Sequence, residues 1–156
     1  MTWRIELPHY GPRGGPLTFK RGRNGKPVPA LTDNTRVHWA KRSSLQKAIR
    51  TCVAQLARAY NIPAQEHITV RLEYHVLTRH RRDEDNLSPI TKPAFDGLGP
   101  AKDPYWSPAK GRWVGAAAGA NIVPDDTPTY MAKDQTRIVH APERSTPVMV
   151  LVIEPS

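Results

Sequence analysis

Cysteine is nearly absent from this sequence: Cys52 is the one cysteine among 156 residues. A single thiol excludes an intrachain disulfide and any zinc site made of the chain's own cysteines. The sequence also lacks an apolar run of about 18 residues and a basic-then-apolar leader, so it predicts neither a transmembrane helix nor a signal peptide. We therefore expect a soluble, cytoplasmic protein in a reducing compartment.

Three common site motifs are also missing. Gly14-Gly15 is not followed by Lys-Ser/Thr at the spacing of a phosphate-binding P-loop, and the six histidines include no H-E-x-x-H pair. An EF-hand loop counted from Asp83 would need a glycine at its sixth position, where Ser88 stands. The sequence therefore predicts no nucleotide cofactor, no zincin-type zinc site and no EF-hand calcium site.

Acidic residues are scarce in the first third of the chain. Residues 1–58 contain twelve Lys and Arg against Glu6 and Asp33, and the whole chain carries a formal net charge of +9. Such a surface attracts polyanions, and nucleic acid is the partner that it favours. One alternative is a basic protein without such a partner. An anionic membrane is less favoured, because no basic amphipathic helix carries large apolar anchors.

The hydrophobic pattern predicts one mixed α/β (α+β) domain over residues 1–156. Alternating apolar residues predict strands, and one long segment with apolar residues at helical spacing predicts a helix. Residues 148–153 are apolar on both faces and are expected to form a central strand or an interface strand. The other expected elements are strands at residues 2–7, 68–76, 122–126 and 136–140, and a helix capped by Ser43 or Ser44 that Asn61-Ile62-Pro63 ends.

Residues 8–33 are rich in proline and glycine and predict a loop rather than regular structure. We favour a role for this basic loop in holding DNA phosphates, and the alternative is a merely solvated loop. Its tip is a run of cations without acidic partners, namely Lys20, Arg21, Arg23 and Lys26. On the outer face of the helix, a simply solvated surface is favoured over DNA contact for Lys47, Arg50 and Arg58.

Tryptophans leave two further alternatives open. For Trp39, at the entrance of the expected helix, a role as a core anchor is favoured over a role in base stacking. Residues 99–120 form an expected ordered insertion in which aromatic residues alternate with cations. Trp106 and Trp113 in this insertion either stack on unpaired bases or cap the core.

The densest charge follows the strand expected at residues 68–76. The basic residues of this stretch come directly before Asp83 and Asp85. On an extended segment, residues i and i+2 point to one face, so both carboxylates would face one Mg²⁺ or Mn²⁺ ion. The cations that would hold DNA phosphates there are Arg79, Arg81 and Arg82, with His80 between them.

A third carboxylate from Asp125 or Asp126 would complete a metal site for in-line attack on a phosphodiester. Lys92 is expected near the start of a short helix capped by Thr91, where it would stabilise negative charge on the reacting phosphate. The alternatives are acids that merely lie in turns, and an ordinary ion pair between Lys92 and Asp96 at helical spacing.

Three motifs of this sequence resemble those of the RusA-type endodeoxyribonucleases, which are homodimeric, Mg²⁺-dependent Holliday junction resolvases often encoded by phages and prophages. The likeness covers most of the chain. Lys92 follows Asn86 by six residues rather than three, and the insertion at residues 99–120 lengthens the pattern. The motifs are Arg81-Arg82-Asp83-x-Asp85-Asn86-Leu87, Lys92-x-x-Phe95-Asp96-x-Leu98 and a hydrophobic-x-Asp125-Asp126.

The resemblance implies a RusA-like fold and metal-binding catalytic roles for Asp83, Asp85 and Asp126. It implies a catalytic or charge-stabilising role for Lys92, with less defined roles for Asp125 and Asp96. The implied activity is symmetric nicking of four-way DNA junctions by a homodimer with Mg²⁺, or Mn²⁺ as a substitute, in a bacterial host cell. The alternatives are a non-catalytic branched-DNA-binding protein and a metal nuclease for other branched or flap DNA.

Overall fold

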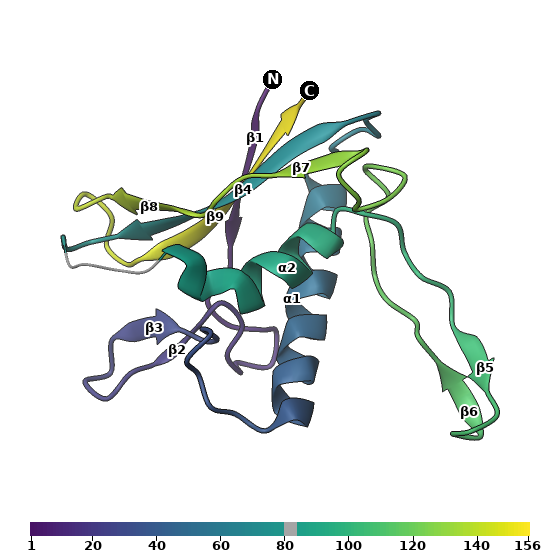
Figure 1. Ribbon diagram of the computed structural model, residues 1–156. Coiled ribbons are helices and arrows are strands. Elements are labelled where there is room, and N and C mark those ends of the chain that lie inside the picture. Colours follow the sequence, from purple (N-terminus) through teal and green to yellow (C-terminus); the bar gives the residue numbers. More distant parts are fainter. Residues whose placement is uncertain (80–83) are drawn as a thin grey trace.

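A mixed β-sheet lies against two helices, α1 and α2, and a separate hairpin extends away from this body (Figure 1). The computed structural model describes residues 1–79 and 84–156, and the side chains of all of these except Glu84 and Asp85. The chain forms a single α+β domain, as the sequence predicted. Its elements are β1 (Trp3–Leu7), β2 (Phe19–Arg21), β3 (Pro27–Pro29), α1 (Trp39–Ala59), β4 (Ile68–Val76), η1 (Glu84–Leu87), α2 (Ser88–Asp96), β5 (Tyr105–Ser107), β6 (Arg112–Val114), β7 (Met131–Lys133), β8 (Arg137–His140) and β9 (Val148–Pro155).

The strand β4 is the centre of the sheet. Strand β9 pairs with it antiparallel, and β1 pairs antiparallel with the other side of β9. The remaining edge of β4 is shared by two short parallel strands, β7 against Ile68–Val70 and β8 against Glu73–Val76. The loop that contains Asp126 leads directly into β7, so the parallel pairing fixes the end of this loop at the start of β4.

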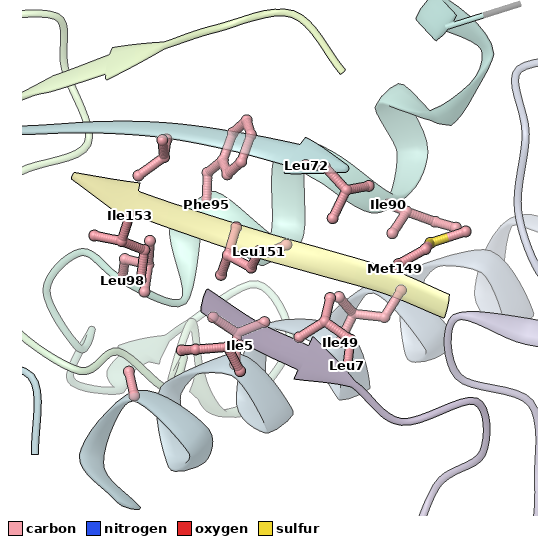
Figure 2. Packing of buried hydrophobic residues seen from close by; sticks show 14 of the residues in the cluster. Ile5, Leu7, Ile49, Leu72, Ile90, Phe95, Leu98, Met149, Leu151 and Ile153 are labelled. Carbon is pink, nitrogen blue, oxygen red and sulfur yellow. The ribbon is translucent and has the colours of Figure 1, made fainter. Parts of the chain in front are cut away.

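The main core lies between the sheet and the helices (Figure 2). Alternate residues of β1, β4 and β9 point to this face, because successive strand residues face opposite sides of a sheet. Each large side chain that is fully buried contributes roughly 1.5–3 kcal/mol. Those labelled in Figure 2 are Ile5, Leu7, Ile49, Leu72, Ile90, Phe95, Leu98, Met149, Leu151 and Ile153.

The opposite face of the sheet carries a small valine cluster beside a buried ion-pair network. Val148, Val150 and Val152 are buried there, which confirms that β9 is a central strand with apolar residues on both faces. Glu73 of β4 forms ion pairs with Arg4 of β1 and, at 3.1 Å, with Arg71. Burial would raise the pKa of Glu73, but hydrogen bonds from Arg4, His75 and Arg71 prevail and lower it to about 2.

Four expectations about the local structure were wrong. The helix α1 begins at Trp39 and is capped by His38, whose Nδ1 accepts from the amide of Ala40 at 3.3 Å, and not by Ser43 or Ser44. Trp39 is 75% exposed and is not a core anchor. The loop over residues 8–33 contains the β2–β3 hairpin, and residues 122–126 form turns instead of a strand.

The position of Lys92 in α2 also differs from the expectation. The helix begins at Ser88 with Pro89 in its first turn, so Lys92 lies in the middle and Thr91 is not the cap. Pro93 then lies inside the helix and cannot donate to the carbonyl of Pro89, four residues earlier. Gln46 of α1 supplies the missing donor, because its Nε2 donates to the Pro89 oxygen at 3.0 Å.

No helix in the described part of the chain is long and apolar enough to cross a membrane.

Glu73→Gln should remove an acid-sensitive part of the stability. A carboxyl group whose pKa falls on folding stabilises the native state above its unfolded pKa, roughly 4.3. This stabilisation is lost as the pH falls from that value towards about 2, the pKa of folded Glu73. Urea unfolding of wild type and variant between pH 7 and pH 2 should therefore give a difference that shrinks as the solution becomes acidic. A difference independent of pH would contradict the ion-pair account.

Gln46→Ala should destabilise the protein by about 1–3 kcal/mol, because the buried Pro89 carbonyl loses its donor. Gln55→Ala is the matched control, since Gln55 is exposed on the same helix. This control should change the free energy of unfolding by less than about 0.5 kcal/mol. Chemical denaturation of both variants measures the comparison, and equal effects would show that the Gln46–Pro89 bond does not stabilise α2.

Candidate functional site

Two carboxyl groups from distant parts of the sequence lie in contact. Asp96 is the last residue of α2, and Asp126 lies in the loop before β7; their side chains are 18% and 42% exposed. The two side chains, called here the carboxylate pair, lie close enough to interact directly. Two ionised carboxylates at such a distance repel each other, so ionisation of one opposes ionisation of the other.

The surroundings favour the neutral form more strongly at Asp96 than at Asp126. Burial raises the pKa of Asp96, and the hydrogen bond and charge of Asp126 raise it further, against the opposing charges of Arg50 and Lys133. The pKa of Asp126 is lowered, first by the hydrogen bond with Asp96 and also by Lys133, whose Nζ lies 3.8 Å from Oδ2 of Asp126. Asp126, the more exposed of the two, is therefore the member that ionises more readily.

The Asp126 loop is fixed at both ends by backbone hydrogen bonds. The amide of Ile122 donates to Leu98, just after α2, and the amide of Ile68 donates to Tyr130, each at 3.0 Å. Within the loop, Oδ1 of Asp125 accepts from the amide of Asp126 at 2.8 Å. Asp125 thus orders the loop backbone, and Asp126 is the residue that meets Asp96.

An open hollow of about 480 Å³ lies beside the carboxylate pair and has cationic walls. Lys92 of α2 and Lys133 of β7 line it together with Arg42 of α1. Because Lys133 also lies next to Asp126, the hollow and the carboxylate pair are neighbours. Three cations with the hydroxyl groups of Ser88 and Thr91 suit an anion with several oxygen acceptors, such as a phosphate group.

The segment expected to bring Asp83 and Asp85 together is described only in part. Asp83 lies outside the described residues, as do Arg81 and Arg82. Asp85 belongs to the 3₁₀ helix η1, so an extended backbone at this residue was a wrong expectation. The next residue is tied to the loop after β3, because the amide of Asp33 donates to both oxygens of Asn86, at 3.0 Å and 3.1 Å.

Asp33 is a carboxylate that the motif analysis missed. Its Oδ1 accepts from the hydroxyl group of Ser88 at 2.8 Å, so it lies at the junction of η1 and α2. It thereby connects the basic N-terminal segment to the segment that bears Asp85. Its position in a Thr-Asp-Asn turn gives no sequence signal for this contact, which depends on tertiary folding.

The oxygen atoms of the carboxylate pair suit a hard divalent cation. Oδ1 of Asp96 is buried and has no hydrogen-bond partner among the described residues, and Asp126 supplies a second carboxylate beside it. These are ligand types that Mg²⁺ and Mn²⁺ prefer. Within residues 1–79 and 84–156, no three acidic, histidine or cysteine side chains form a complete metal-binding group.

The expected DNA-binding cations have different surroundings. Arg21, Arg23 and Lys26 are exposed on the β2–β3 hairpin, Lys20 is half-buried there, and none has an ion pair with any described residue. The turn between these strands is closed by the amide of Gly22 donating to Lys26 at 2.8 Å. Arg79 instead donates through Nε to His140 at the end of β8, at 3.0 Å.

Two arginines expected to be solvated have fixed partners. Arg50 donates through Nε to Ala118 at 2.7 Å and through Nη2 to Pro100 at 3.2 Å, and its Nη1 lies 4.0 Å from Asp96. Arg58 donates to the carbonyl of Gly119. Both bind the base of the 99–120 insertion, whereas Lys47 is exposed as expected.

Asp96→Asn should raise the thermal stability of the metal-free protein at pH 7. An asparagine amide can donate to Asp126, and the substitution removes the repulsion between two adjacent carboxylates and the cost of a half-buried acid with an unpaired oxygen. The gain should be about 1 kcal/mol, as is common when a functional residue is replaced. Thermal unfolding in EDTA measures it, with Asp134→Asn as the control because Asp134 is exposed. Equal or lower stability of Asp96→Asn would contradict this account of the carboxylate pair.

The comparison with known proteins gives one distant relative. An uncharacterized protein from Xylella fastidiosa (strain Temecula1 / ATCC 700964) is 30% identical over 80 residues, which are 48% of this chain and 52% of that protein. The chain therefore spans about half the length of the curated relative that it matches. No family model matches the chain.

Proposed function

We propose that this protein is a Mg²⁺-dependent endodeoxyribonuclease that cuts branched DNA, with the four-way junction as its substrate. The observation that carries the proposal is the Asp96–Asp126 pair beside the hollow formed by Lys92, Lys133 and Arg42. Phosphodiester hydrolysis needs carboxylates that hold a divalent cation and cations that hold the phosphate. Here both groups of side chains come from different elements and adjoin one another.

Each group has a defined role in this proposal. Asp126, assisted by Asp96, would hold Mg²⁺ together with Asp83 and Asp85, and the bound ion would supply an activated water and charge neutralisation. Lys92 and Lys133 would hold the non-bridging oxygens of the phosphate and stabilise the charge that grows on them. Arg42, which also lines the hollow, would hold a neighbouring phosphate.

The distribution of charge supports DNA as the polyanion. The cations of the β2–β3 hairpin have no ion-pair partner among the described residues. This hairpin belongs to the segment that Asp33 ties to Asn86, so a DNA backbone held by the hairpin would extend towards the site. Contacts of this kind release counterions, and binding should weaken steeply with salt. In the proposed homodimer, two-fold symmetry would present two such sites to two strands of one junction.

A synthetic four-way junction with one labelled strand tests the activity. Wild-type protein with Mg²⁺ should nick the junction, and Asp126→Asn and Asp85→Asn should each lower the rate by more than about 100-fold, the upper range for losing even an outer partner of a metal ligand. Asp134→Asn is the matched acidic control and should cut at the wild-type rate. Single-turnover gels measure all four proteins.

Four outcomes would contradict parts of the proposal. Equal cutting by wild type and Asp126→Asn would refute the site, and equal cutting of linear duplex would refute the preference for junctions. Tight junction binding without any Mg²⁺-dependent or Mn²⁺-dependent cutting would favour the non-catalytic branched-DNA-binding protein. Preference for a flap substrate in the same assay would favour the nuclease with another branched substrate.

A further inference from the structure

The insertion forms a projecting arm, defined here as residues 100–119 with the β5–β6 hairpin at its end (Figure 1). Three aromatic side chains of the arm are exposed: Tyr105 by 62%, Trp106 by 51% and Trp113 by 64%. The alternative in which these tryptophans cap the core is therefore wrong. Large exposed aromatic clusters on a soluble surface usually mark a binding site.

The two tryptophans form a cross-strand pair. Trp106 lies opposite Trp113 in the antiparallel register, and their rings meet edge to face with centroids 5.9 Å apart. Such pairs stabilise a hairpin by roughly 0.2–1 kcal/mol, and an isolated two-stranded hairpin is only marginally stable. Part of their role is thus structural. At least half of each tryptophan nevertheless remains exposed, so a bound molecule can still contact it.

Tyr105 lies on the opposite face of the hairpin, because it is adjacent to Trp106 in β5 and successive strand residues face opposite sides. A Cβ atom at Gly115 would lie 2.5 Å from the ring atom Cε1 of Tyr105, and Gly115 has a φ of +85°. The glycine therefore leaves room for the Tyr105 ring against the arm backbone. The surface on which planar groups can stack is formed by Trp106 and Trp113 on the other face.

The base of the arm is fixed to the body, which distinguishes it from a flexible linker. Arg50 donates to carbonyls of both legs, at Ala118 and Pro100, and Lys102 pairs with Ala117 through two backbone hydrogen bonds of 2.9 Å and 3.1 Å. A Cβ atom at Gly119 would lie 2.4 Å from the carbonyl carbon of Pro100, so the legs are in direct contact.

The charge of the arm favours an anionic partner. The arm contains three basic residues, Lys102, Lys110 and Arg112, and one acidic residue, Asp103. Arg112 lies in β6 directly before Trp113. An apolar protein partner would not need these cations. Aromatic rings interleaved with cations are the combination that binds single-stranded nucleic acid, through stacking on bases and attraction to phosphates.

We propose that the arm binds unpaired nucleotides of a DNA strand by stacking their bases on Trp106 and Trp113. The proposal rests on the function proposed above, because it assigns the arm to the same DNA substrate. The extended chain from Gly99, beside Asp126, to Trp106 spans at most about 23 Å. The arm would therefore hold bases within about seven nucleotides of the cleavage site, at the duplex rise of 3.4 Å.

Binding to a fluorescein-labelled oligo(dT) 12-mer without Mg²⁺ tests the arm independently of cleavage. In the Asp126→Asn background, the 12-mer should bind and quench tryptophan fluorescence. Trp106→Ala with Trp113→Ala should weaken binding at least tenfold, since stacking of one base is worth roughly 1–3 kcal/mol. Trp106→Phe with Trp113→Phe should restore most of the affinity. Tyr60→Ala, which removes an exposed aromatic residue outside the arm, should change nothing.

A second variant keeps the tryptophan pair and therefore the hairpin. Lys110→Gln with Arg112→Gln should lower the salt slope of oligo(dT) binding by roughly 1.4, at 0.7 for each lost phosphate contact. Wild-type affinity of the Trp-to-Ala variant, or absence of quenching, would overturn the proposal. If the arm variants sediment differently from wild type but bind DNA equally well, the proposal is overturned. The arm would then contact a second copy of this chain. If an arm variant loses oligo(dT) binding and still cuts junctions, the proposed nuclease activity stands, and the arm acts in binding alone.

Discussion

The close contact between α1 and α2 is the constraint on which the rest of the structure depends. At Gly97 the two helices approach so closely that a Cβ atom would lie 2.6 Å from the carbonyl oxygen of Arg50 and 3.0 Å from Cβ of Val53. Only glycine fits this contact without moving a helix. The contact lies one residue after Asp96 and three residues before the arm begins, so it fixes the positions of both.

The same contact explains how a helix with two prolines is tolerated. Pro89 occupies the first turn of α2, where a missing amide costs little, but Pro93 leaves a carbonyl without a donor. Since α1 lies close by, Gln46 can reach that carbonyl. Proline also limits the conformations of the unfolded chain. A helix of nine residues that would be marginal alone is therefore held in one conformation by its neighbour.

The sequence allowed the regular part of the fold to be predicted, because that part has a strong hydrophobic period. Alternation identified β4 over Ile68–Val76, and the two apolar faces of β9 indicated its central place. The start of α1 was misplaced because His38 is not among the strongly preferred capping residues, and two serines further along were better candidates. The short strands β2, β3, β5 and β6 have three residues each, too few for a period to emerge.

The candidate site was predictable where it depended on local motifs and not where it depended on packing. The acidic pair at residues 125–126 and the acid at the end of α2 were visible as single residues, and their contact was not. Lys133 and Arg42 carry no motif, since a lone cation is common on any surface. Their convergence follows from the parallel β4–β7 pairing and the α1–α2 contact, which arise from long-range contacts.

Arg50 connects these observations to one another. Its guanidinium group lies 4.0 Å from the half-buried Asp96 and donates to both legs of the arm. A charged group shared by two sites couples them, because its attraction to one carboxyl group depends on how firmly its other donors are held. The carboxylate pair and the base of the arm are therefore connected through one side chain. If the arm binds a DNA strand, this linkage would transmit the binding to the carboxylates, where the proposed chemistry takes place.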